Sequence, residues 1–188
     1  SNPDDPRMAA QSDTYLVLKK LEKTDCGSLA VCVTKNSGLE VCSMTAHVLS
    51  GAVRPRTGVR TEKESAVYHA SSEICRGEKV TLVKYTILTD SIRRKDVAEA
   101  AKHDMMQAES KGIDYYYQAQ SEYMEHFWHS SEMTIDGADG INDSVSFNMY
   151  ELLQSASNDC HSNIAAKGLS GEGYEGHYFW DTEMFILP

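Results

Sequence analysis

Alternating apolar and polar residues in the first half of the chain predict β-strands. The segment "SLAVCVTK" (28–35) alternates apolar residues with smaller or polar ones, and "GLEVCSMTAHVL" (38–49) repeats that period. Between the two segments, Asn36-Ser37-Gly38 supplies residues that favour a tight turn. The pattern therefore predicts an antiparallel hairpin.

Two later segments show the same period. "ESAVYHASSEIC" (64–75) and "KVTLVKYTILTD" (79–90) predict a second hairpin across Arg76-Gly77-Glu78. Gly58 and Arg54-Pro55 predict a loop between the two hairpins. Short strands at this spacing, with no helical pattern between them, are typical of a sandwich of antiparallel sheets.

Near Ser91 the period changes to that of helices. The segment 93–112 is rich in Ala, Lys, Glu and Met and ends at Gly112, as a helix C-terminus should. The segment 113–132 places aromatic residues at helical spacing, which predicts a stripe packed in a core. A further helix is predicted to start near Gly140 to Asn142. Because strands precede helices without alternation, a doubly wound α/β fold is excluded.

Composition narrows the class of protein. The 188 residues carry a formal charge of −10, which argues against nucleic acid or an anionic membrane as a partner. Five scattered cysteines without a CxxC pair suit a reducing compartment. No apolar run approaches the roughly 20 residues needed to cross a bilayer. A cytoplasmic protein is therefore expected.

The sequence offers two weak metal motifs. His126-x-x-His129, beside Glu122 and Glu125, lacks a third ligand at a familiar spacing and is typical of a solvated helix face. The stretch 136–143 ("DGADGIND") has its acidic residues at the wrong positions for a calcium loop. We expect neither a metal site nor a bound cofactor.

The C-terminal segment contains the glycine spacing of a dinucleotide-binding turn. Gly171, Gly173 and Gly176 match the pattern, but no apolar strand precedes them and bulky aromatic residues follow. Glu172 and Glu175 would also repel a pyrophosphate. The context therefore excludes a dinucleotide site.

The residues behind these glycines suit a sugar. An aromatic ring can cover the apolar face of a sugar, and a carboxylate can accept hydrogen bonds from two adjacent hydroxyls. Trp180 and Asp181 supply both groups in a glycine-rich loop. The alternative is a buried aromatic residue with Asp181 capping a helix that begins at Thr182. The candidate lining consists of His177, Tyr178, Phe179, Trp180, Asp181 and Glu183.

A family resemblance favours the sugar alternative. "AAKGLSGEGYEGHYFWDTEMFILP" (165–188) resembles, almost residue for residue, the signature of glycoside hydrolase family 65. "FNMYELLQSAS" is similar to the family's first barrel helix, and "TKNSGLEV" and "NPDDPRM" are similar to its N-terminal domain. The family holds maltose, kojibiose, trehalose and nigerose phosphorylases with a few related hydrolases.

The resemblance implies an α+β multidomain fragment. Residues 1–92 would be part of an antiparallel β supersandwich, 93–136 a helical linker, and 137–188 the first part of an (α/α)6 catalytic barrel. The abrupt end of the chain would then reflect a piece of a longer protein. The complete protein is expected to be a homodimer.

The implied reaction is an inverting phosphorolysis. A carboxylic acid protonates the glycosidic oxygen of a glucose disaccharide such as maltose or kojibiose, while the co-substrate inorganic phosphate attacks the opposite face. The products are β-glucose 1-phosphate and glucose. The acid, a glutamate, would lie downstream of this chain, so no catalytic residue is assigned here. The alternatives are a trehalase-like hydrolase and a non-catalytic carbohydrate-binding module.

The resemblance also assigns roles to the candidate residues. Trp180 and Asp181 match the motif that holds the non-reducing glucose, with Asp181 on paired hydroxyls and Trp180 or Phe179 on the ring face. Two groups would act indirectly: His177, Tyr178 and Glu183 would orient the loop, and Gly171, Gly173 and Gly176 would shape it.

Overall fold

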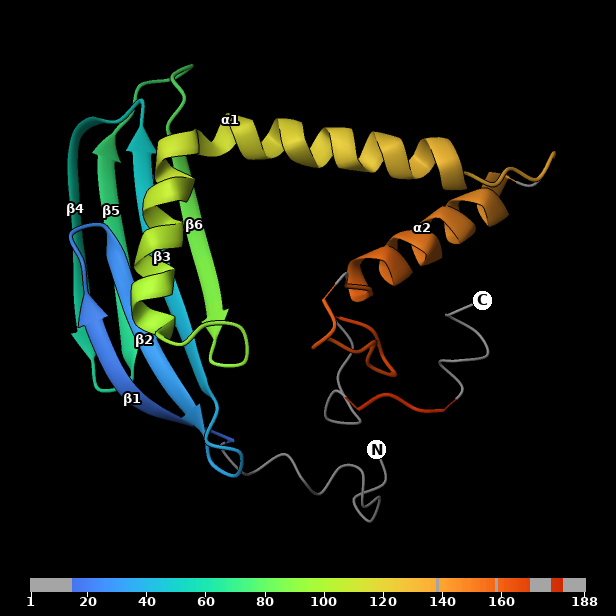
Figure 1. Ribbon diagram of the computed structural model, residues 1–188. Coiled ribbons are helices and arrows are strands. Elements are labelled where there is room, and N and C mark those ends of the chain that lie inside the picture. Colours follow the sequence, from blue (N-terminus) through green and yellow to red (C-terminus); the bar gives the residue numbers. More distant parts are fainter. Residues whose placement is uncertain (1–14, 138, 158, 170–176, 181–188) are drawn as a thin grey trace, which may run out of the picture. The chain divides into compact units, whose positions relative to one another are not determined.

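The computed structural model describes residues 15–137, 139–157, 159–169 and 177–180. Within these ranges, six strands precede two helices (Figure 1). The first compact unit ends at Gln120, and the second begins at Ser121. The elements are β1 (Leu16–Lys23), β2 (Gly27–Thr34), β3 (Glu40–Ser50), β4 (Val53–Glu62), β5 (Ser65–Glu73), β6 (Thr81–Asp90), α1 (Val97–Ser131) and α2 (Asp139–Ser155).

The predicted first hairpin is confirmed. Strands β2 and β3 are antiparallel neighbours in a four-stranded sheet of order β1-β2-β3-β6. In the turn, the Gly38 N–H donates to the carbonyl of Thr34 at 3.1 Å, and Gly38 has a φ of 67°. This left-handed conformation is one that glycine adopts without steric cost. The local turn residues therefore determine the hairpin.

The predicted second hairpin is wrong. Strand β5 pairs with β4 in a separate two-stranded sheet, whereas β6 pairs with β3 over ten residues. The pairing brings Ile87 opposite Met44 and Tyr85 opposite Ala46. These cross-strand contacts set the partner of β6, and such contacts are not visible in the local pattern.

The predicted loop around Gly58 and Arg54-Pro55 is also wrong, because these residues belong to β4. Proline lacks an N–H, and sheets tolerate it at an edge or a bulge. Strand β4 has one partner strand among the described residues, and its register with β5 shifts between Val53 and Arg56. Arg54 takes a φ of 47° at this irregularity.

The first half of α1 packs on one face of the four-stranded sheet (Figure 1). Asp96 caps the helix by accepting from the Glu99 N–H at 3.0 Å. The core between α1 and the sheet contains Leu29, whose surface is 1% exposed. Full burial of a leucine side chain contributes about 1.5–3 kcal/mol to stability. Around Leu29 lie the buried residues Val31, Cys42, Val97 and Ala101, with Met44, Ile87 and Ala98 packed against them.

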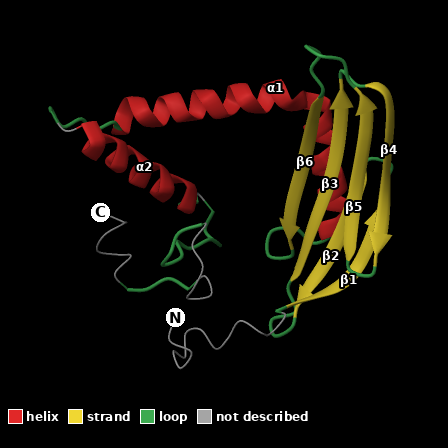
Figure 2. Cartoon of the chain, turned by 180° about the vertical axis from the view of Figure 1, so that it is seen from behind, coloured by secondary structure: helices red, strands yellow, loops and turns green. Residues whose placement is uncertain are grey.

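The two-stranded sheet β4-β5 lies on the opposite face from α1, as Figures 1 and 2 show. The imidazole of His47 on β3 stacks parallel to the ring of Tyr68 on β5, with 4.1 Å between ring centroids. The Nδ1 of His47 donates to the carbonyl of Cys26 at 2.8 Å, because a carbonyl can only accept. This bond fixes the orientation of the ring that joins the two sheets.

The predicted helix break is confirmed, since Gly112 has non-helical angles of φ 76° and ψ 166° inside α1. Contrary to the expected buried stripe, Tyr115, Tyr116, Tyr117 and Tyr123 are exposed. The described residues confirm the predicted order of antiparallel sheets followed by helices. A helical barrel is not visible in these residues.

Candidate functional site

Helix α2 precedes the segment that carries the predicted sugar-binding residues, which is called the candidate loop. Polar side chains form hydrogen bonds at both ends of this helix. At its start, the Asn142 amide accepts from the Ile135 N–H at 2.8 Å and donates to the Ile135 carbonyl at 3.0 Å. At its end, the Ser155 hydroxyl donates to the Glu151 carbonyl at 2.7 Å. A serine near a helix end commonly makes this bond to the carbonyl four residues earlier.

A turn at residues 165–168 brings the chain back to the end of α2. The Gly168 N–H donates to the Ala165 carbonyl at 2.9 Å, and Gly168 takes a φ of 68°. The following Leu169 N–H donates to the Ser155 hydroxyl at 3.2 Å. Gly168 was not among the loop-shaping residues that the sequence predicted. Ser155, a common helix-end residue, also offered no sequence signal.

The base of the loop is closed by a backbone bond. The Ala166 N–H donates to the His177 carbonyl at 3.1 Å. His177 and the next three residues are exposed, and Trp180 is exposed over 74% of its surface. Tyr178 and Phe179 likewise present aromatic surface to solvent. Four of the predicted lining residues, His177 to Trp180, are therefore exposed directly after this bond, and their role in sugar binding stays a prediction.

The remaining predicted residues lie outside the described part of the chain. These are Asp181, Glu183, Gly171, Gly173 and Gly176. Their roles stay predictions.

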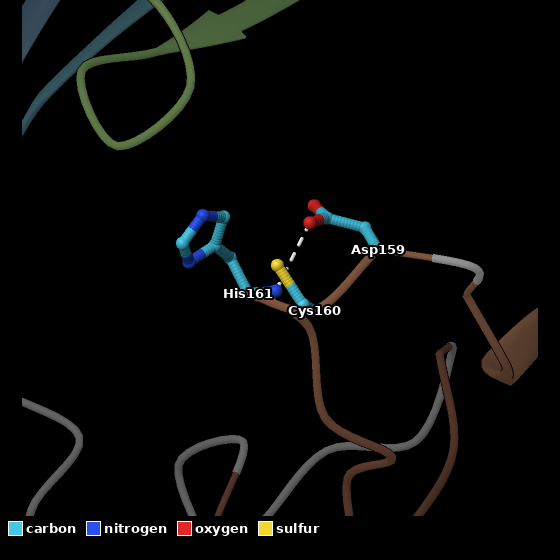
Figure 3. Close-up of side chains that lie close together, drawn as sticks. All are labelled: Asp159, Cys160 and His161. Atoms are coloured by element: carbon cyan, nitrogen blue, oxygen red, sulfur yellow. Dashed lines mark hydrogen bonds between the residues drawn. The ribbon is translucent and has the colours of Figure 1, made fainter.

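Three potential metal ligands are close together in the turn after α2 (Figure 3). One ligand atom each of Asp159, Cys160 and His161 lies within 4.8 Å of the others. The Asp159 carboxylate accepts from the His161 backbone N–H at 3.0 Å, which forms a local turn. The spacing motifs that predict zinc sites do not include three consecutive residues, so the sequence did not indicate this cluster. The turn alone accounts for the proximity.

The cysteines differ in expected reactivity. Cys42 has no exposed surface, and burial raises the pKa of its thiol, whereas Cys75 and Cys160 are exposed. Because the thiolate is the reactive form, a maleimide should label Cys160 and Cys75 at least ~100-fold faster than Cys42 in the folded chain. Peptide mass spectrometry over time measures this difference. Equal rates for Cys42 and Cys160 would contradict the packing of α1 on the sheet.

Comparison with known families covers most of the chain. Residues 1–127 match the family described as "Glycosyl hydrolase family 65, N-terminal domain", and residues 146–188 match "Glycosyl hydrolase family 65 central catalytic domain". The chain belongs to glycosyl hydrolase family 65. The closed loop of this family 65 chain therefore lies in the part that matches the catalytic domain.

Several relatives of the family 65 chain are disaccharide phosphorylases. It is 31% identical to an α,α-trehalose phosphorylase of Thermoanaerobacter brockii over 92% of the chain and 23% of that protein. An α,α-trehalose phosphorylase of Geobacillus stearothermophilus is 43% identical over 59% of the chain and 15% of that protein. A kojibiose phosphorylase of Halothermothrix orenii is 40% identical over 50% of the chain and 12% of that protein. The chain thus spans less than a quarter of these relatives.

A solved structure shares the fold of the family 65 chain. It comes from the human microbiome and is provisionally assigned as a kojibiose phosphorylase. The TM-score is 0.77, with 20% sequence identity, over 92% of this chain and 23% of that chain.

Among the described residues of the family 65 chain, no helix is both long and apolar enough to cross a membrane.

Proposed function

We propose that this chain is part of an inverting α-glucoside phosphorylase. The complete enzyme would cleave a glucose disaccharide with inorganic phosphate to give β-glucose 1-phosphate and glucose. The observation that carries this proposal is the match of residues 146–188 to the family's catalytic domain, because that segment contains the whole closed loop. Relatives named for trehalose and kojibiose phosphorolysis support a disaccharide substrate.

In this proposal the loop binds the non-reducing glucose. Asp181 accepts hydrogen bonds from two adjacent hydroxyls, and the exposed indole of Trp180 covers the apolar face of the ring. Phe179 is the alternative ring partner. His177, Tyr178 and Glu183 orient these groups, and the glycines allow the backbone to approach the sugar. The exposure of Trp180 suits this role, because a ring that binds a sugar must be accessible.

The chemistry itself needs two groups outside this assignment. A carboxylic acid gives its proton to the glycosidic oxygen as the bond to the anomeric carbon breaks. A phosphate oxygen forms a bond to that carbon from the opposite face, so the configuration inverts and the product is the β anomer. None of the residues in this chain is proposed as the acid. The chain's contribution is to hold the sugar in place for the attack.

A phosphate-dependence assay tests the proposal. The complete protein is incubated with trehalose, kojibiose or maltose, with and without phosphate, and the products are followed by proton NMR. We expect β-glucose 1-phosphate from at least one disaccharide, and omission of phosphate should lower turnover at least ~100-fold, because phosphate is the nucleophile. Residues 1–188 alone serve as a control and should show no phosphorolysis.

Each other outcome identifies a different function. Glucose release that does not depend on phosphate would show the hydrolase alternative. Sugar binding without turnover by the complete protein would show a carbohydrate-binding module. Release of the α anomer of glucose 1-phosphate would overturn the inverting mechanism.

A further inference from the structure

We propose that Ser155 is a positioning residue for sugar binding, acting through the loop that carries Trp180. The inference rests on the proposed function, because it assigns the effect of Ser155 to the affinity for the disaccharide. Ser155 is the last residue of α2 and lies 25 positions before Trp180 in the sequence. Its hydroxyl forms hydrogen bonds both to the helix and to the chain that enters the loop.

The two hydrogen bonds use the hydroxyl in opposite ways. Its O–H donates to the Glu151 carbonyl at 2.7 Å, which can only accept. That bond directs the hydrogen into the helix and leaves the oxygen lone pairs for the Leu169 N–H, which donates at 3.2 Å. A hydroxyl that donates is also a better acceptor. The Leu169 backbone is thereby anchored to the last residue of α2.

Gly168 allows this approach for two reasons. Its φ of 68° lies in the left-handed region, which side chains with a Cβ disfavour. A Cβ at this position would also lie 3.0 Å from the Ser155 hydroxyl oxygen, a distance tighter than ordinary contact. Glycine therefore permits both the turn and the close contact that brings Leu169 to Ser155.

The turn that Ser155 anchors is also bonded to the segment that carries Trp180. The Ala166–His177 backbone bond joins the residues on either side of positions 167–176, and Trp180 follows His177 by three positions. Ala166 lies three positions before Leu169, so the bond to Ser155 and the bond to His177 hold the same short turn. Anchoring this turn to α2 restrains the position of His177 and of the exposed Trp180 that follows it. Ser155 therefore acts on substrate affinity.

The test uses the complete protein and three serine variants. Ser155→Ala removes both bonds, and Ser155→Thr keeps the hydroxyl. Ser144→Ala is the matched control, because Ser144 lies on the same helix and donates to the Gly140 carbonyl at 3.0 Å, the same i to i−4 bond. No hydrogen bond from Ser144 to the loop is found among the described residues.

We expect Ser155→Ala to raise KM for the disaccharide roughly three- to tenfold, the range that one neutral hydrogen bond gives. The values of kcat and of KM for phosphate should stay within about twofold, because the loop does not contact phosphate in this proposal. Ser155→Thr should restore KM, and Ser144→Ala should leave it unchanged. A merely structural role would instead lower the active fraction, and so kcat, with KM unchanged.

Hydrogen exchange gives a readout that does not need activity. The Leu169 amide should exchange faster in Ser155→Ala than in Ser144→Ala or Ser155→Thr. A wild-type protein without phosphorolysis would refute the proposed function. An active wild type whose KM is unchanged in Ser155→Ala would overturn the positioning role alone, as would unchanged exchange at Leu169.

Discussion

Gly27→Ala is expected to destabilise the first compact unit by about 3–5 kcal/mol, which is a large share of the stability of one domain. A Cβ at this position would lie 1.9 Å from the Thr45 carbonyl oxygen and 2.6 Å from its carbon. Both atoms are backbone, so no side-chain rotation can relieve the contact. The ends of β2 and β3 would have to separate.

That separation would break several hydrogen bonds at once. The His47 N–H donates to the Cys26 carbonyl at 2.9 Å, and His47 Nδ1 donates to the same oxygen at 2.8 Å. Ser28 and Thr45 are joined through their hydroxyls at 3.2 Å. The buried Leu29 follows two positions after Gly27, so the disturbance would reach the core under α1.

Urea denaturation followed by circular dichroism measures this loss. Gly58→Ala is the matched control in the same compact unit, because its Cβ would meet the His69 ring at 2.6 Å. That ring is a side chain of the two-stranded sheet and can rotate away. We therefore expect the free energy of unfolding to fall by about 1 kcal/mol or less. Equal losses for the two variants would contradict the close approach of β2 to β3.

If the proposed function holds, Asp181→Ala in the complete protein is expected to lower kcat/KM for the disaccharide about 10²- to 10⁴-fold. In the proposed site this carboxylate accepts hydrogen bonds from two sugar hydroxyls, and hydrogen bonds to a charged group contribute about 1.5–3 kcal/mol each. Asp181→Asn keeps the shape but loses the charge, so it should retain more activity than the alanine variant.

Steady-state kinetics under initial-rate conditions measure the effect, with thermal unfolding to confirm that each variant is folded. Asp143→Ala is the control, because Asp143 is an exposed aspartate on α2 in the same compact unit. Its activity should stay within about twofold of wild type. An Asp181→Ala enzyme with unchanged kcat/KM would remove this residue from the sugar site.

The sugar role of the residues from His177 to Glu183 stays a prediction. Local sequence offers aromatic and acidic groups side by side, and the resemblance to family 65 favours a sugar over a buried aromatic residue with a helix cap. The anchor at Ser155 and Gly168 could not be predicted in this way. The hydroxyl of Ser155 bonds to Leu169, 14 positions away, and serine at a helix end has many other uses.

The sequence by itself determined the features that depend on neighbouring residues: the turn at Gly38, the helix break at Gly112, the start of α2 and the membership in family 65. Only the tertiary structure decided that β6 pairs with β3 and that Pro55 lies in a strand. The physical reason is that turns and helix ends follow from local backbone energetics. Strand partners and loop anchors follow from contacts between distant residues, and their fit depends on burial and register rather than on local pattern.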